Sequence, residues 1–210
     1  MATLNNGLLG GFSGKVGDFI GSTCRGVEYI KRRPVKMTNP KTKSQTKQRS
    51  RFVVTQNFLR TFTPFIRIGF KNFAVNGMSA FNAAMSYNMK NAIKEGSEGN
   101  ELDYSRVLIS RGSLFTTIST NAKVVENKLL IEWDPTIKEN ASANDQVMVL
   151  AFNSSKIESV YDINAGKRSN ALTVLELPAT WNGDVIETFI SFKNEVGTMI
   201  SDSCNVCINK

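Results

Sequence analysis

The second half of the chain alternates apolar and polar residues with the period of two that is typical of half-buried β-strands. Turn clusters such as Asp134-Pro135 and Trp181-Asn182-Gly183 separate these short apolar runs. The runs fall at residues 107–109, 122–125, 128–133, 146–153, 159–163, 170–177, 185–194 and 198–208. Because no helical period interrupts them, residues 103–210 are predicted to form a β-sandwich.

The alternation also assigns strand faces. Leu129, Ile131 and Trp133 share one face of their run, and Phe189 alternates with Ile190 and Phe192. The run 146–153 is apolar on both faces, with Val147, Val149 and Ala151 opposite Met148, Leu150 and Phe152. Roughly six to eight strands in a segment of this length suggest an immunoglobulin-like or fibronectin-III-like module. The stretch LLIEWDP at 129–135 resembles the second strand of fibronectin type III domains.

The first 36 residues predict a glycine-rich β-hairpin arm, with strands at 16–23 and 26–33 that end before Pro34. Within it, GGFSGKVG at 10–17 looks like a phosphate-binding loop. Such a loop needs glycine where Leu9 stands and Ser or Thr where Val16 stands, and a helix must follow. We therefore expect the glycines to form turns and close contacts. A two-stranded hairpin is marginal alone, so the arm should pack elsewhere or add to a sheet.

Residues 37–94 predict a basic helical region, which makes the whole chain α+β. A first helix begins between Asn39 and Thr42 and runs through Phe62, and Pro64 interrupts it. Two further helices are predicted at 65–75 and 79–93. The helical spacing of Phe and Met favours packing in a core over base stacking on nucleic acid.

Charge is divided along the chain. The net charge is +8, but residues 1–94 carry 16 Lys or Arg and 2 acids, whereas residues 95–210 carry 10 Lys or Arg and 16 acids. No acid occurs between Glu28 and Glu95. Such a basic segment repels itself unless a nucleic acid, an anionic surface or the acidic half of the same or a neighbouring copy offsets it. The sign changes at the polar stretch KEGSEGN (94–100), which predicts a linker at 95–102.

The sequence lacks the residues that several kinds of catalytic and metal-binding site require. Histidine is absent, which excludes a Ser-His-Asp triad, a Cys-His dyad and histidine-ligated zinc. The three cysteines, Cys24, Cys204 and Cys207, favour a reducing compartment over a disulfide framework, and CNVC at 204–207 is a lone CxxC. No apolar run reaches the ~18 residues of a membrane span, and the N-terminus does not have the pattern of a signal peptide. We expect no metal, no cofactor and no membrane span.

A series of short motifs runs through the chain. They are GFSGKVG (11–17), NPKT (39–42) with Gln45, Arg49 and Phe52, GFKN (69–72), FNAA (81–84), SYN (86–88), DYS (103–105) and SRG (110–112). With these motifs the chain resembles an uncharacterised protein family common in Bacteroidota genomes and their mobile elements. The resemblance implies an N-terminal α/β region followed by a sandwich domain, and it implies no activity and no catalytic residues.

These observations favour a non-enzymatic structural or assembly protein of phage or mobile-element origin, located in the cytoplasm or in a virion. The arm would reach a neighbour by strand addition, in a homo-oligomer or a larger assembly. The alternative is a nucleic-acid-binding protein, and a third hypothesis is an enzyme with an unrecognised carboxylate site. The candidate residues for binding nucleic acid or a protein partner are Lys31, Arg32, Arg33, Lys36, Lys41, Lys43, Lys47, Arg49 and Arg51.

Overall fold

The computed structural model describes residues 3–4, 11–24, 26–35, 39–75, 77–96 and 99–208. They divide into two compact units. The first contains Met1–Lys43 and Val75–Gly77, and the second contains Ser44–Ala74 and Met78–Lys210. The α+β class is confirmed, because three α-helices accompany several antiparallel sheets.

The first unit is built on a four-stranded antiparallel sheet in the order β1-β2-β3-β4. Its strands are β1 (Thr3–Leu4), β2 (Phe12–Val16), β3 (Phe19–Cys24) and β4 (Val27–Arg32). The predicted hairpin is present as β3 and β4, but β2 and β1 extend it to a larger sheet. Lys15 of the phosphate-loop-like stretch lies in β2, and the strand β3 follows it after a turn at Gly17, whose φ is +55°.

The helical region begins with α1 (Lys43–Leu59), which continues through the 3₁₀ turn η1 (Arg60–Phe62) into α2 (Thr63–Gly69). Pro64 stands in the first turn of α2, where its missing N–H costs no hydrogen bond. After η2 (Lys71–Phe73), the helix α3 (Ala80–Asn91) begins at Ser79, whose side chain accepts a 3.0 Å hydrogen bond from the backbone N–H of Asn82. The three predicted helices are therefore confirmed.

Residues 95–102, where the sequence predicted a linker, belong instead to a hairpin of β5 (Ile93–Gly96) and β6 (Gly99–Leu102). The hairpin lies inside the second unit. Its side chains connect it to α1, since Lys47 forms an ion pair with Glu95. The polar composition of the segment indicated exposure correctly, but it did not indicate the pairing of the two short strands.

The rest of the second unit contains two antiparallel sheets, in the orders β10-β9-β12-β13 and β11-β8-β7. The strands are β7 (Thr120–Val125), β8 (Lys128–Trp133), β9 (Gln146–Asn153), β10 (Glu158–Lys167), β11 (Leu172–Glu176), β12 (Ile186–Lys193) and β13 (Cys204–Val206). The 3₁₀ turns η3 (Arg168–Asn170) and η4 (Ala179–Trp181) flank β11.

One predicted strand is absent, and another is much shorter than predicted. Residues 107–109 form no strand, and of the run 198–208 only 204–206 is a strand, with isolated bridges at Ile200, Ser201 and Ile208. The backbone of 108–109 bonds to side chains instead, since Leu108 N–H donates to Asn88 Oδ1 at 3.0 Å and Ile109 N–H donates to Ser203 Oγ at 2.9 Å. The apolar alternation of 107–109 predicts a strand, but among the described residues this segment pairs with no other strand.

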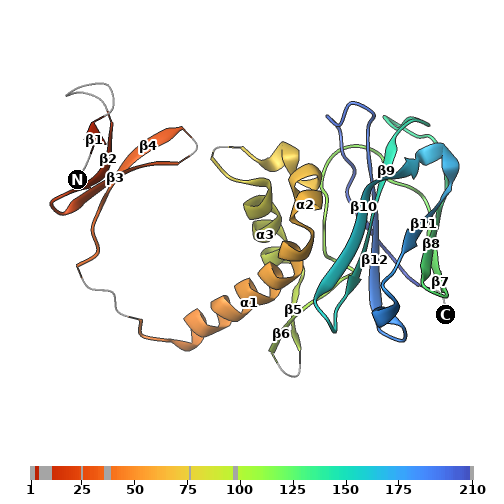
Figure 1. Ribbon diagram of the computed structural model, residues 1–210, viewed down its shortest axis with the longest axis horizontal. Helices are drawn as coiled ribbons and strands as arrows, with labels where there is room; N and C mark the ends of the chain where they lie inside the picture. The colour runs from red at the N-terminus through yellow and green to blue at the C-terminus, as the bar shows by residue number, and fades with distance from the viewer. Residues whose placement is uncertain are drawn as a thin grey trace. The chain divides into compact units, whose positions relative to one another are not determined.

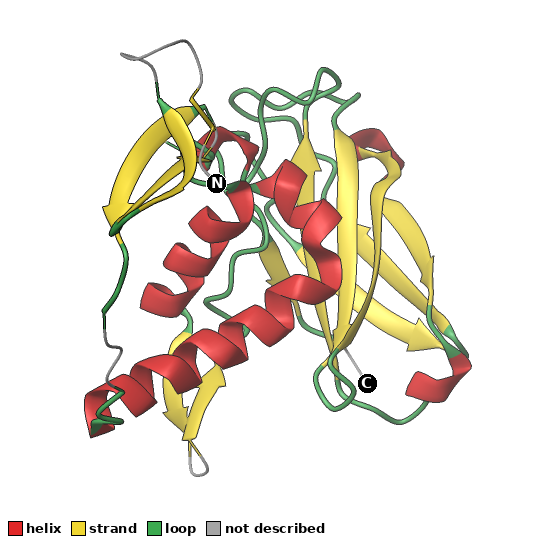
Figure 2. Cartoon of the chain, turned by 60° about the vertical axis from the view of Figure 1, so that its left-hand side comes forward, coloured by secondary structure: helices red, strands yellow, loops and turns green. Residues whose placement is uncertain are grey.

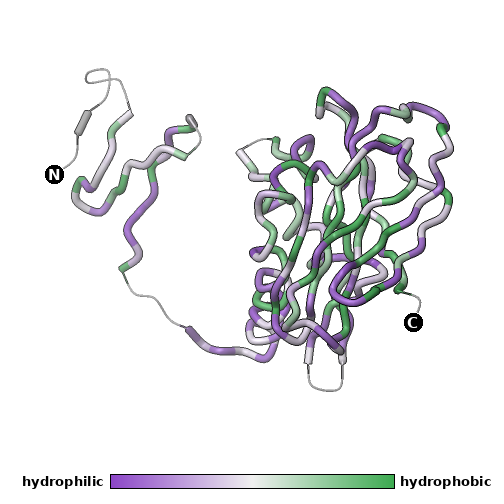
Figure 3. Tube along the Cα trace, turned by 45° about the vertical axis from the view of Figure 1, so that its right-hand side comes forward, coloured by the Kyte–Doolittle hydropathy of each residue, from purple (hydrophilic) through white to green (hydrophobic). Residues whose placement is uncertain are grey.

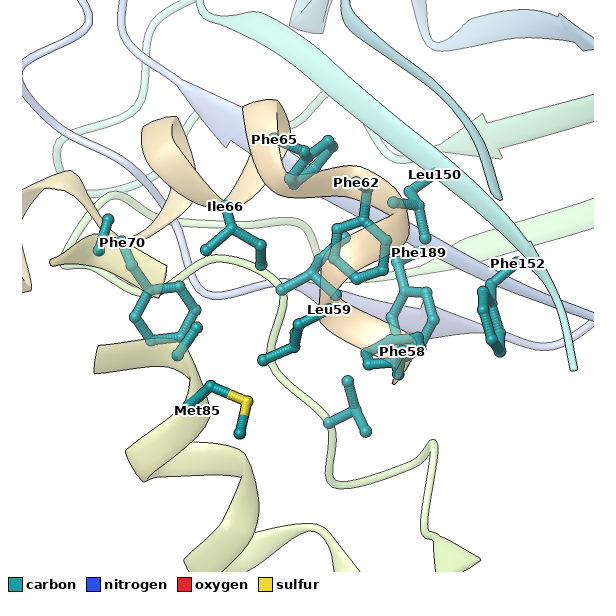
Figure 4. Close-up of a cluster of buried hydrophobic side chains, with 14 of the residues drawn as sticks. Phe58, Leu59, Phe62, Phe65, Ile66, Phe70, Met85, Leu150, Phe152 and Phe189 are labelled. Atoms are coloured by element: carbon teal, nitrogen blue, oxygen red, sulfur yellow. The ribbon is translucent and has the colours of Figure 1, made fainter. Parts of the chain in front are cut away.

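The β10-β9-β12-β13 sheet of the second unit is covered on both faces (Figures 1 and 2). One face packs on β7, β8 and β11 through a core that contains Ile131, Trp133, Val149 and Phe192. The other face packs on the helices. In Figure 4, Phe58 and Phe62 lie beside Leu150, Phe152 and Phe189 of the sheet, and the Phe58 and Phe152 ring centroids are 4.8 Å apart. As a result, every residue from Val147 to Asn153 is buried.

A fully buried ion pair lies at one end of the sandwich. The Nε of Arg168 is 3.1 Å from an Oδ of Asp145, and the two side chains are 0% and 1% exposed. The Arg168 guanidinium also donates to the carbonyls of Phe115 and Thr116 and lies 3.9 Å from the ring centroid of Phe192. Burial lowers the pKa of Arg168, and the bond to Asp145 opposes that shift. This pair fixes the 115–116 segment to η3.

Replacing Asp145 with Asn should lower the free energy of unfolding by about 3 kcal/mol, because it leaves a buried guanidinium without its counter-charge. Urea denaturation of the two proteins measures the change. Glu132→Gln is the control, since it breaks the exposed pair between Lys123 and Glu132 and should have a much smaller effect. Equal changes in the free energy of unfolding would show that the buried pair stabilises the protein no more than the exposed pair does.

Candidate interaction surface

The predicted basic residues are divided between the two compact units. Lys31 and Arg32 lie on β4, Arg33 follows it, and all three side chains are exposed in the first unit. Lys41 and Lys43 are exposed before and at the start of α1, and Arg49 is exposed within that helix. Lys36 lies outside the described residues.

Lys47 and Arg51 are held by the second unit. The Nζ of Lys47 bonds to an Oε of Glu95, and Arg51 Nη2 donates to the carbonyl of Met89 at 2.7 Å. The hydrogen bond from Lys47 is the main cause that holds the pKa of Glu95 below its ordinary value of 4.5. These two bases therefore connect α1 to the β5–β6 hairpin and to α3. Binding a partner through them would first require these bonds to break.

Apolar and polar residues alternate along the strands of the N-terminal sheet (Figure 3), and several of the apolar side chains are exposed. Phe19 is paired with Val16 and with Arg32, and Ile30 is paired with Gly21, so these side chains lie on one face. Phe19 is 53% exposed and Ile30 is 63% exposed. We call this surface the Phe19 face, and its side chains are Phe12, Val16, Phe19, Thr23, Glu28, Ile30 and Arg32.

Gly21 in the middle of the Phe19 face is required by close packing. A Cβ at this position would lie 2.7 Å from a ring carbon of Phe12, too close for real carbon atoms. The glycine lets the half-buried ring of Phe12 lie against β3. The sequence indicated that the glycines allow close approach, but it did not indicate that they shape an exposed apolar face.

The opposite face of the sheet is more basic. Lys15, Ile20 and Lys31 lie in register across three strands, and Tyr29 lies beside Lys31, whose Nζ is 5.9 Å from the centre of the tyrosine ring. Asp18 and Glu28 are the acids of the first unit. The sheet thus combines exposed apolar groups with an excess of positive charge.

The motifs in the second unit are explained by packing. The Nδ2 of Asn88 donates to Leu108 O at 2.8 Å, and Ser110 Oγ donates to Ser201 O at 2.9 Å. The Arg111 guanidinium stacks 5.0 Å from the ring centre of Tyr87, and a Cβ on Gly69 would lie 2.5 Å from the carbonyl oxygen of Ile109. These residues join α3 and α2 to the 107–112 segment, so they build the fold. GFSGKVG, in contrast, lies in the exposed sheet.

The described residues offer neither a metal-ligand cluster nor a membrane-spanning helix. Among the described residues, no group of three or more Cys, Asp or Glu side chains could hold a metal ion. Cys24 and Cys207 are exposed, Cys204 is half-buried, and all three are free thiols. No described helix is long and apolar enough to cross a membrane.

A family model matches residues 11–207, which include β2 to β4 and nearly all of the second unit. The chain belongs to the family of unknown function DUF6266. No curated protein and no solved structure matches it. Because the DUF6266 match begins at the first residue before β2, the Phe19 face is part of the region that defines the family.

Replacing Lys47 with Met should raise the pKa of Glu95 toward 4.5, because the substitution removes the donor that stabilises the carboxylate. Carboxyl NMR titration measures the shift. Since the pKa of Glu95 is lowered by folding, its stabilising effect is present above the ordinary value and is lost as the pH falls through the lowered one. Lys43→Met, four residues earlier on α1, should leave the pKa of Glu95 unchanged. A shift caused by both variants would contradict a specific pair.

Proposed function

We propose that this protein is a non-enzymatic structural protein that self-associates through its N-terminal sheet. The observation that carries the proposal is the Phe19 face, where apolar side chains remain exposed in a small sheet. Sheets of soluble proteins bury at least one face against another layer, because the buried apolar area stabilises them. An uncovered apolar face rimmed by polar residues is typical of a protein–protein contact.

Competing surfaces are already occupied, which supports this choice. The apolar sides of the helices pack on one face of the β10-β9-β12-β13 sheet. The other face of that sheet packs on the β11-β8-β7 sheet. Among the described residues, the largest set of exposed hydrophobic side chains close together in sequence is in the first unit: Val16, Phe19, Val27, Tyr29, Ile30 and Val35. The edge of β4 offers a further contact by strand addition.

We also infer that the sandwich is fibronectin-III-like. Its seven strands, β7 to β13 in chain order, can be assigned as A, B, C, C′, E, F and G. The observed sheets then contain A, B and E on one side and C′, C, F and G on the other, which is the fibronectin type III arrangement. Modules of this kind commonly serve in assembly and adhesion, so the assignment agrees with a structural role without proving one.

Nucleic-acid binding is the second candidate function. The observation that favours it is the combination of exposed Tyr29 with the exposed bases Lys31, Arg32 and Arg33 on and after one strand. Exposed strands that interleave aromatic and basic side chains can stack bases and contact phosphates. The excess of aliphatic groups, such as Ile30 and Val27, agrees better with a protein partner.

Replacing Phe19 with Asp should weaken self-association of the full chain at least about tenfold, because it places a charge in the apolar contact. Sedimentation velocity over a range of protein concentrations measures the effect. Val174→Asp is the matched control, since Val174 is 49% exposed on β11. A wild-type chain that stays monomeric at every concentration would contradict the proposed function.

The nucleic-acid hypothesis makes a separate prediction for the triple variant with Ala at Lys31, Arg32 and Arg33. The salt dependence of single-stranded DNA binding should fall by about 2 units in the slope of log K against log salt, because fewer counterions are released. Fluorescence anisotropy at several salt concentrations measures it. The control removes three exposed lysines of the sandwich: Lys123, Lys128 and Lys138. An equal fall in both variants would contradict a specific site on β4.

A further inference from the structure

The strand β4 is a free edge of the N-terminal sheet. Every residue of β4 is exposed, and the strand pairs with β3 on one side only. The N–H of Arg33, the residue after β4, donates to the carbonyl of Asp18 at 2.6 Å. Because backbone groups alternate in direction along an antiparallel strand, the odd-numbered residues of β4 turn theirs toward β3. Glu28, Ile30 and Arg32 therefore turn their N–H and C=O groups outward, where another strand can pair with them.

The edges of the sandwich are less open than the edge of β4. The edge strand β10 is long, but its register with β9 shifts between Asp162 and Gly166. Such irregularities bend a strand and oppose further pairing. The strand β7 is bridged at Ala122 by Ile208, and β13 is short, at three residues. Among the described strands, β4 thus stands out as a regular edge that is exposed along its whole length.

The side chains of β4 are complementary to themselves around Ile30. Glu28 precedes Ile30 and Arg32 follows it, and these three side chains share the Phe19 face. On the opposite face Tyr29 precedes and Lys31 follows, and the Nζ of Lys31 already lies 5.9 Å from the centre of the tyrosine ring. In an antiparallel second β4, with the two copies of Ile30 opposite each other, each of these acids faces a base and each ring faces a cation.

We propose that β4 pairs with β4 of a second copy in this register, with Glu28 of each copy opposite Arg32 of the other. The facing residues exchange their backbone hydrogen bonds, because Glu28, Ile30 and Arg32 are the residues that turn outward. The contact is isologous, and it joins two four-stranded sheets into one continuous sheet. This inference rests on the proposed self-association, and it identifies the contacting strand, the symmetry and the register.

Charge selects this register over its neighbours. If the second copy slides by two residues in one direction, Glu28 comes to lie opposite Ile30 and loses its base. If it slides in the other direction, Lys31 lies opposite Lys31 of the second copy, and like charges directly opposite each other are unfavourable. Charged side chains commonly protect an edge strand from pairing. On β4 they disfavour most partners, but they favour an identical strand in one register.

Glu28 and Arg32 are available for this contact. Both side chains are exposed, and neither belongs to an ion pair among the described residues. The Glu28 carboxylate lies in the space that a Cβ on Gly11 would fill. Rotation about its own side-chain bonds turns it toward the edge without moving the backbone. Phe19→Asp should weaken this contact too, because its carboxylate would lie beside Arg32 and compete with Glu28 of the second copy.

The experiment reverses the two charges separately in the full-length protein. Glu28→Lys places like charges at both ends of the contact, and so does Arg32→Glu, so each variant should self-associate about tenfold more weakly than wild type. Mixed in equal amounts, they should form a 1:1 heterodimer of about wild-type affinity, because two bases of one copy then face two acids of the other. Sedimentation velocity measures both effects. Glu195→Lys, at an exposed turn of the sandwich, is the matched control and should change nothing.

A cross-link tests the register independently of charge. In the proposed register Ile30 lies opposite itself, with about 5.5 Å between the Cα atoms, which a disulfide can span. Ile30→Cys should therefore form a covalent dimer in oxidised glutathione, in a background with Ser at Cys24, Cys204 and Cys207. Arg32→Cys in the same background is the control, because the two copies of that residue lie at opposite ends of the contact. Non-reducing electrophoresis measures the cross-link.

Each other outcome has a distinct meaning. If both charge variants self-associate as tightly as wild type, β4 is not the contact and the inference is overturned. Loss of association in Phe19→Asp alone would then indicate that the Phe19 faces pack on each other, and the proposed function would stand. Folded variants that are weakened but form no heterodimer also overturn the inference. If the charge variants do not fold, the cross-link decides, and its absence at Ile30 overturns the register.

Two outcomes point to other partners. Association that disappears after nuclease treatment would mean that nucleic acid bridges the copies, which contradicts direct strand pairing. A wild-type chain that stays monomeric at every concentration overturns both this inference and the proposed function.

Discussion

The burial of both faces of the β10-β9-β12-β13 sheet is the constraint on which the rest of the second unit depends. One set of side chains on β9 faces the sandwich core and the other set faces the helices, so this strand has no solvent side. The helices must therefore direct their phenylalanine rows at the sheet, and Phe58, Phe62 and Phe65 are all fully buried or nearly so. The second unit thus buries both faces of this sheet, whereas several apolar side chains of the N-terminal sheet are exposed within their own unit.

Charge is used in three different ways in the chain. Arg168 and Asp145 are buried together, where the pair fixes loop geometry at a cost in desolvation. Lys47 and Glu95 form an exposed pair that joins α1 to a hairpin across the point where the charge sign changes along the sequence. The bases Lys15, Lys31 and Arg32 of the N-terminal sheet stay exposed, and in the second unit Glu126 is an exposed acid. Ion pairs inside the second unit thus offset part of the divided charge, and we propose that a partner offsets the rest.

The sequence predicted the elements whose signals are local. The limits of β8 and β9 were predicted correctly because their alternation is continuous, and Pro64 correctly marked the boundary between the first two helices because it lacks a backbone N–H. Alternation predicts a strand at 107–109, because it cannot show that the backbone partners of this segment are the side chains of Asn88 and Ser203. Contacts between distant residues, such as Lys47 with Glu95, leave no local pattern. For the same reason, the sequence did not separate Lys47 and Arg51, which bond within the fold, from the other candidate bases.

Hydrogen exchange of the N-terminal sheet at different protein concentrations tests the central claim most directly. Exchange is slow where a stable structure protects the backbone amides, and a small uncovered sheet opens easily. If another copy covers the sheet, the amides of β2 to β4 should exchange fast in dilute protein and slowly in concentrated protein, while those of β9 stay protected throughout. Protection of β2 to β4 that does not change with concentration would contradict the account.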